Sequence, residues 1–223
     1  MNARNEAGTS SAETTVRYVH SYDSSRRWKD FNACGQAAVA TLLDYHDRNP
    51  FGLEKSKYDP RDGMHHWEND AIIHRIKEGF PPDYFRGLFG TTPERIAEAL
   101  RGAGLQATTS WSRDPAEGLR IWREAKEWIS AGFPVIAIVD RGKLGGRPFA
   151  AHWAVVYRVA GSVVHLACTK NVDTLSEDRF LTAFACRFMP PPFNHAVVLS
   201  RPTLGQAMSH SPSTGSTDQH RGT

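Results

Sequence analysis

The sequence predicts an α+β fold, with helices in the first half of the chain and antiparallel strands in most of the second. Apolar residues before position 131 recur at helical spacing. The segments that follow are short, β-branched and separated by glycine turns, as is typical of strands. Strands and helices do not alternate regularly, which argues against a parallel sheet of βαβ units.

Four helices are predicted in the first part of the chain. The third has the clearest signals, because Thr92 suits the N-cap, Pro93 suits the first turn, and a glycine follows the last apolar residue. Asn32 stands just before the first helix and could cap its start. The predicted helices cover residues 34–46, 71–79, 92–102 and 119–130.

The second part combines strands with one more helix. Residues 134–140 are nearly all apolar, which suits a buried strand. Residues 152–159 and 162–167 flank an Ala-Gly turn and are predicted to form a hairpin. Ser176, followed by two acidic residues, indicates a helix start within 174–184. A last strand is predicted at 196–200.

Composition limits the class of protein. The 223 residues are 40% hydrophobic and 23% charged, as in an ordinary globular protein. A net charge of +3 is too small to suggest nucleic acid as a partner. No apolar run is long enough to span a membrane, and three cysteines cannot form a disulfide framework. These features predict a reduced, cytoplasmic protein without a membrane segment.

The two ends differ from the rest of the chain. Residues 1–15 and 203–223 are polar and small, so we expect them to be disordered. No linker rich in serine, glycine or proline divides residues 16–202. The sequence therefore predicts one domain over residues 16–202.

Two residues stand out as candidates for chemistry. Cys34 lies at the predicted N-terminus of a helix, where free N–H groups and the helix dipole stabilise a thiolate and lower the thiol pKa. His152 opens a predicted strand, from which an imidazole can accept and return a proton. Taken singly, Cys34 could also be a packing residue and His152 a half-buried polar residue.

Several segments together resemble C39-like peptidases, which are cysteine peptidases of the papain fold known from the leader-cleaving domains of bacteriocin exporters. The stretch around Cys34 resembles the family's nucleophile helix, and the stretch beginning at His152 resembles its histidine hairpin. The matching segments, in order, are NACGQAA at 32–38, FGTTPERIAEALRGAGLQATT at 89–109, AGFPVIAIVD at 131–140, AHWAVVYRVAGSVVHLA at 151–167, and LSEDRFLTAF with NHAVVLSRP between 175 and 202. The resemblance implies a papain-like fold whose helical part carries the cysteine and whose antiparallel sheet carries the histidine.

The remaining site positions depart from the family. Cys168 occupies the slot of the acid that orients the imidazole, and Asp173 or Asn171 could take over that role. No glutamine stands at the family's oxyanion position, one helical turn before the cysteine, and Asn32 could donate an amide N–H instead. Gln36 comes after Cys34 and is expected to be structural or exposed to solvent.

The resemblance implies a cysteine peptidase or amidase that acts on a peptide or amide through a thioester, with Cys34 as nucleophile, His152 as base and no cofactor. Two alternatives remain open: an acyltransferase or transpeptidase with the same pair, and a weakened module that binds a peptide without cutting it. A partner protein in a peptide-processing pathway is compatible with either. The adjacent pair His65-His66 lacks a zinc-binding spacing, so we expect a polar loop and no metal site there.

Overall fold

The structure is a computed structural model of the chain, and it describes residues 16–17, 19, 33–60, 63–84, 90–145, 151–167, 174–186 and 194–203. The described part contains five helices and two antiparallel sheets. The helices are α1 (Cys34–Tyr45), α2 (Asn69–Gly79), α3 (Pro93–Gly102), α4 (Pro115–Ser130) and α5 (Glu177–Phe184). The strands are β1 (Lys57–Asp59), β2 (Met64–His66), β3 (Leu105–Ser110), β4 (Val135–Asp140), β5 (Ala151–Ala160), β6 (Val163–Ala167), β7 (Thr174–Ser176) and β8 (Val197–Pro202).

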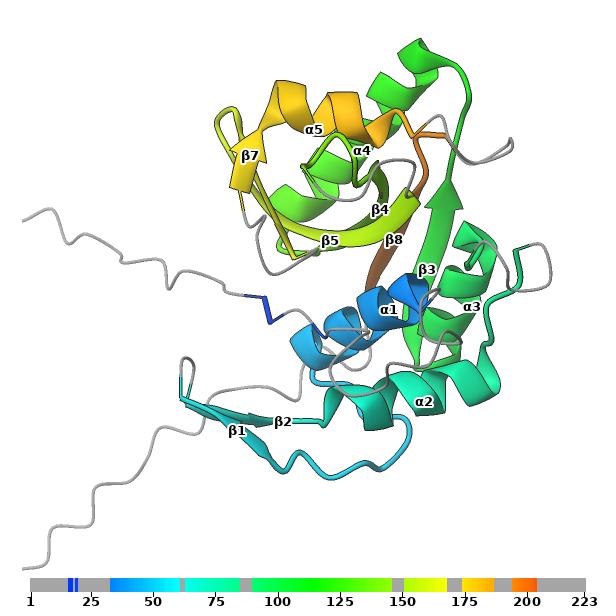
Figure 1. Cartoon of the computed structure of the whole chain (residues 1–223), viewed down its shortest axis with the longest axis vertical. Helices are drawn as coiled ribbons and strands as arrows, with labels where there is room; N and C mark the ends of the chain where they lie inside the picture. Colours follow the sequence, from blue (N-terminus) through cyan, green and yellow to red (C-terminus); the bar gives the residue numbers. More distant parts are fainter. Residues whose placement is uncertain are drawn as a thin grey trace, which may run out of the picture.

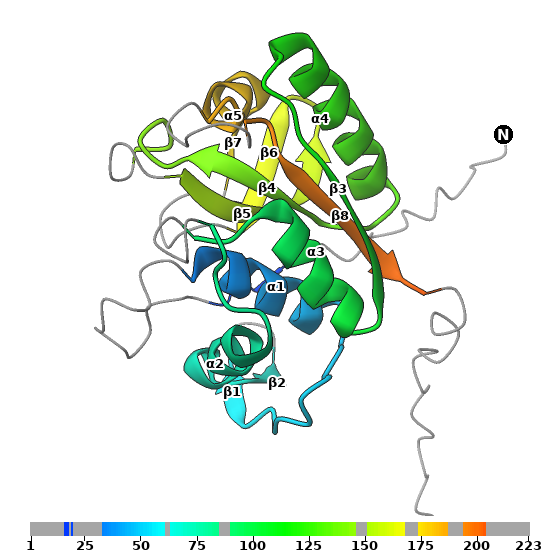
Figure 2. The same cartoon turned by 90° about the vertical axis from the view of Figure 1, so that its right-hand side faces the viewer.

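A six-stranded sheet separates two groups of helices (Figure 1). Its strand order is β3-β8-β4-β5-β6-β7, and every neighbouring pair is antiparallel. Helices α1 and α3 lie on one face, with α2 below α1 and farther from the sheet, and α4 and α5 lie on the other face (Figure 2). The predicted combination of helices with an antiparallel sheet is confirmed.

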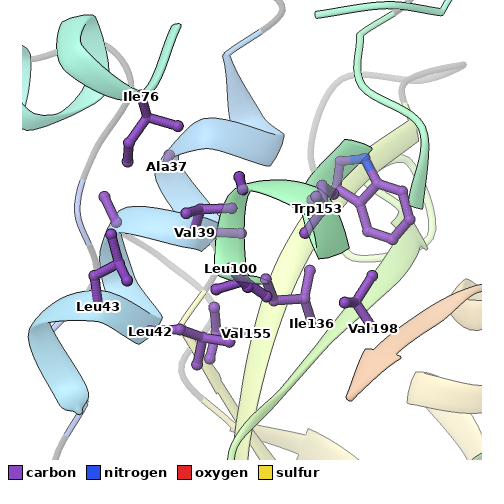
Figure 3. Packing of buried hydrophobic residues seen from close by; sticks show 14 of the residues in the cluster. Ala37, Val39, Leu42, Leu43, Ile76, Leu100, Ile136, Trp153, Val155 and Val198 are labelled. Carbon is purple, nitrogen blue, oxygen red and sulfur yellow. The ribbon is translucent and has the colours of Figure 1, made fainter. Parts of the chain in front are cut away.

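Two hydrophobic cores, one on each face, hold the layers together. In β4, Ile136 and Ile138 pack with α1, whereas Val135 and Ala137 pack with α4 and α5. Because both faces are covered, all six residues of β4 are buried, which explains why the first five are apolar; the sixth is Asp140. The core on the side of α1, called the α1 core below, includes Leu42, Ile136 and Trp153. Figure 3 shows this core, where the ring of Trp153 projects from the sheet.

Several predicted helix starts are confirmed. The side chain of Thr92 accepts a hydrogen bond from the N–H of Arg95 at the start of α3, and Ser176 does the same for the N–H of Arg179 at α5. Helix α4 begins earlier than predicted, at Pro115, because the Asp114 side chain accepts from the N–H of Glu117 and proline fits the first turn. Residues 174–176, which lead into the predicted helix start at Ser176, form the short strand β7.

The proposed cap of the first helix is wrong. Ala33 occupies the N-cap of α1 and its side chain accepts no hydrogen bond. The residues from Gly35 to Leu43 are all buried. A helix buried on every side is stabilised by tertiary packing, so it can form without a side-chain cap.

Two features lie outside the predictions or the described residues. The small sheet of β1 and β2 was not predicted, because strands of three residues carry too little pattern to recognise. The predicted disordered segment 1–15, and all of the predicted segment 203–223 except Thr203, lie outside the described residues. Within the described part, no helix has both the length and the apolar character that crossing a membrane requires.

Candidate active site

Cys34 is the first residue of α1 and is partly buried against the α1 core. Three backbone N–H groups lie close enough to stabilise its charged form: those of Cys34 itself, Gly35 and Trp153. The first two belong to the free N–H groups that every helix start provides. The third comes from β5, on a distant part of the chain, so α1 delivers the thiol directly to the sheet.

The register of the sheet explains why the Trp153 amide is available. Trp153 in β5 stands opposite Ile138 in β4, and the N–H of Ile138 donates to the carbonyl of Ala196 on the other side of β4. Opposite residues of an antiparallel pair exchange either both hydrogen bonds or neither. The N–H of Trp153 therefore points away from β4, to the side where the Cys34 sulfur lies.

His152 immediately precedes Trp153 and is only 4% exposed. Its partner in β4 is Val139, which packs with α4 and α5, so the imidazole leaves the strand on that face. The Cys34 sulfur meets a backbone N–H, and such groups lie in the plane of the sheet. The sulfur thus lies at the edge of β5, beside the residue that follows His152.

The environment of the thiol differs from the expectation. Burial raises the pKa of Cys34 above its usual value, although the three backbone N–H groups and the positive charge of Arg141 act in the opposite direction. Desolvation penalises the thiolate more than the helix start stabilises it. This raised pKa works against the thiolate that a helix start alone would favour, so removal of the thiol proton falls to a base.

Arg141 is a site residue that the sequence analysis missed. It follows the last residue of β4, at the end of the sheet where β5 begins, because Asp140 is paired with Ala151. Its charge acts on the Cys34 thiol. The only available signal in the sequence was a basic residue directly after a buried strand, and this does not reveal what faces the side chain.

A hydrogen-bonded network holds the start of α1. The Gln36 side chain donates to the carbonyl of Phe80 at 3.0 Å and accepts from the Thr91 hydroxyl at 3.2 Å. The carbonyl of Thr91 accepts from the indole N–H of Trp153 at 2.9 Å. Gln36 therefore has a structural role, as expected, and its amide is already engaged.

Gly35 allows this network to form. A Cβ atom at this position would lie 2.8 Å from Cβ and 2.9 Å from Oγ1 of Thr91. The glycine next to the thiol thus lets α1 approach the segment that leads into α3. This close approach is what brings Cys34 and Trp153 together.

The other predicted site residues are not placed. Asn32, Cys168, Asn171 and Asp173 all lie outside the described residues. Their roles as oxyanion donor or third member of the site therefore stay predictions.

The histidine pair forms part of a strand and not the expected loop. His65 and His66 are in β2, and only His66 is buried. Its Nδ1 lies 2.7 Å from Oδ2 of Asp44, near the end of α1, and the ammonium of Lys55 lies 3.2 Å from Oδ1. These contacts attach the β1–β2 hairpin to α1. Within the described ranges, no three histidine, cysteine, aspartate or glutamate side chains are placed to hold a metal ion.

Comparisons with known proteins give structural neighbours only. No protein-family model matches the sequence, and no curated protein matches it significantly. The peptidase domain of Streptococcus ComA, a bifunctional ABC transporter involved in quorum sensing, is 16% identical with a TM-score of 0.46, over 77% of this chain and 93% of that one.

Two further solved structures are similar. A double-glycine-motif protease from an AMS/PCAT transporter, in complex with the leader peptide, is 16% identical with a TM-score of 0.44, over 76% of this chain and 84% of that one. A protein assigned as a C39-like peptidase from Bacillus anthracis is 12% identical with a TM-score of 0.47, over 78% and 90%. The fold is similar to that of C39 peptidase domains. At these values the likeness assigns no residue and no activity, so both have to come from this chain's own residues.

Proposed function

We propose that the protein is a cysteine peptidase or amidase in which Cys34 is the nucleophile and His152 the general base. The observation that carries the proposal is the position of the Cys34 thiol, at the start of α1 and against the backbone N–H of the residue that follows His152. A nucleophile and a base presented by different elements at one point are the minimum that covalent catalysis requires.

The reaction then proceeds in two halves. His152 accepts the thiol proton while the sulfur attacks the carbonyl carbon of an amide. As the carbon–nitrogen bond breaks, His152 returns this proton to the leaving amine, and a thioester remains on Cys34. Water then attacks the thioester carbonyl while His152 takes a proton from the water. The carbon–sulfur bond breaks, the carboxylic acid is released, and the sulfur takes the proton from His152.

Each feature of the site has a place in this scheme. Burial raises the pKa of Cys34, so the proton has to be removed by a base during attack instead of being lost beforehand. The backbone N–H of Cys34, at a helix start, is suited to stabilise the oxyanion. Asn32 as a second oxyanion donor, and Asp173, with Asn171 or Cys168 as alternatives, as the residue that orients the imidazole, complete the proposal.

One observation favours a second function. A thiol whose pKa is raised by burial is also what a site without catalysis would contain. The alternative is therefore a module that holds a peptide beside Cys34 without cutting it. Transfer of the acyl group to an amine uses the same first half-reaction as hydrolysis. In every case the partner is a peptide or amide, and a reducing, cytoplasmic location suits a site that needs a free thiol.

The rate of Cys34 alkylation tests the proposal. It is measured at several pH values between about pH 5 and 9, from the mass of the peptide that contains the modified cysteine. We expect Cys34 to react near neutral pH in spite of its raised pKa, because His152 accepts the thiol proton during attack. His152→Ala should slow this reaction, and Cys34→Ala should abolish the modified peptide. Cys186→Ala is the matched control, because Cys186 is fully buried and belongs to no part of the proposed site.

Two results would decide against catalysis. Cys34 could react only as an ordinary thiol does, near pH 8.5, or its rate could be the same with and without the His152 imidazole. Either result removes the base from the proposal and leaves the peptide-binding module. If instead the pair is active, a peptide library with and without added amine separates hydrolysis from acyl transfer.

A further inference from the structure

The turn that follows β4 carries an unused positive charge beside the proposed nucleophile. Residues 141–145 contain Arg141 and Lys143 and no acidic residue. Lys143 is exposed, whereas Arg141 is partly buried and its charge reaches the Cys34 thiol. The two side chains therefore have the same charge but different positions relative to the site.

The Arg141 side chain has no partner within the described part of the chain. Its Nε is buried without a hydrogen bond, and none of the ion pairs in the described part includes its guanidinium. The neighbouring carboxylate of Asp140 is engaged elsewhere, because its Oδ1 accepts from the N–H of Gly142 at 2.8 Å. A buried donor without an acceptor is costly, so such a group indicates a missing acceptor.

A guanidinium beside a reactive thiol selects a particular kind of acceptor. Arginine binds carboxylates through a planar fork of N–H donors, and the energy of such a charge-assisted bond increases where water is partly excluded. Gln36 also has a side-chain donor at the start of α1, but this amide is already bonded to Phe80 and Thr91. Among the residues that the structure describes, Arg141 is thus a charged donor that acts on Cys34 and is left available to a substrate.

We propose that Arg141 is a specificity-determining residue that binds a carboxylate of the substrate close to the carbonyl attacked by Cys34. The substrate class is an acidic peptide or acyl donor, whose carboxylate lies within a few bonds of the reacting carbon. This inference rests on the proposed function, because it assumes that Cys34 attacks a substrate carbonyl. The contact between Arg141 and a carboxylate can nevertheless be measured without turnover.

Two alkylating reagents measure this contact. Iodoacetate and iodoacetamide react in the same way: the thiolate sulfur forms a bond to the CH2 carbon, the carbon–iodine bond breaks and iodide leaves. Iodoacetate has a carboxylate next to this carbon, whereas iodoacetamide has a neutral amide of the same shape. Because both reactions use the same thiolate, the ratio of their rates at Cys34 does not depend on the thiol pKa.

We expect the ratio of the iodoacetate rate to the iodoacetamide rate at Cys34 to be higher in the folded protein than in the unfolded protein. The iodoacetate rate should also saturate as the reagent concentration rises. Arg141→Gln should lower the rate ratio by about tenfold, which corresponds to about 1.4 kcal/mol for one charged contact. Arg141→Lys should retain part of the preference. Lys143→Gln, which removes an equal charge from the same turn, should leave the ratio unchanged.

The outcomes separate this inference from the proposed function. If Arg141→Gln and Lys143→Gln give the same ratio as the wild type, Arg141 binds no carboxylate and the inference fails. If the rate ratio falls in His152→Gln but equals the wild-type ratio in Arg141→Gln, the imidazolium attracts the reagent and the inference also fails. If both reagents react slowly at Cys34 but the ratio still depends on Arg141, the proposed catalysis fails and the carboxylate site remains.

Discussion

Replacing Gly35 with alanine should disturb the start of α1, because the added Cβ has no room beside the side chains of Thr91 and Ile96. The added Cβ would lie 2.8 Å from Cβ of Thr91 and 3.4 Å from Cδ1 of Ile96. Thr91 cannot retreat easily, because its carbonyl accepts from Trp153 and its hydroxyl donates to Gln36. One of these contacts has to give way.

The expected loss of stability follows from three contributions. Overpacking in a tight site costs about 1–3 kcal/mol. Weakening one of the two hydrogen bonds of Thr91 adds about 0.5–1.5 kcal/mol. Alanine gains about 0.5–1 kcal/mol over glycine within a helix, which offsets part of this. We therefore expect Gly35→Ala to lower the free energy of unfolding by about 1–3 kcal/mol.

Denaturant and thermal unfolding measure this loss, and each kcal/mol should lower the Tm by about 2–4 °C in a protein of this size. Gly79→Ala is the control, because it makes the same change at a helical position with nothing within 4 Å of the new Cβ. The control should be neutral or slightly stabilising. If Gly35→Ala behaves like Gly79→Ala, α1 does not approach Thr91 as closely as described, and the argument for the position of Cys34 is wrong.

Two further predictions concern the other regions of the fold. Gly118→Ala should lower the free energy of unfolding by about 1–3 kcal/mol in a denaturant titration, because the new Cβ would lie 2.5 Å from the ring of His195. This ring is held by a contact of 3.1 Å to the carbonyl of Ser112. Stability equal to the wild type would show that the ring moves freely. Burial, with a smaller effect from Arg48, lowers the pKa of His46 to about 4, so the unfolded state binds a proton first as the pH falls. The protein should lose up to about 3 kcal/mol of stability between about pH 6.5 and pH 4 through this residue, and His46→Gln should lose less over the same range; an identical loss in both proteins would refute the shift.

Local signals were sufficient for most elements of the fold. The cap at Thr92 and the cap at Ser176 are read from side chains within one turn of the N–H groups that they bind. The buried strand β4 follows from the unbroken apolar run of its first five residues. The cap of α1 was mispredicted at Asn32, because a helix enclosed by packing on all sides does not depend on a local signal at its start.

The sequence by itself determined that a cysteine begins a helix and that a histidine begins a strand after a buried strand, because these are properties of neighbouring residues. Only the tertiary structure decided what surrounds the thiol. The amide of Trp153 and the charge of Arg141 reach Cys34 through the pairing of β4 with β5 and the packing of α1 on the sheet. Burial, which no local pattern reveals, reverses the direction in which a helix start alone would move the pKa of Cys34.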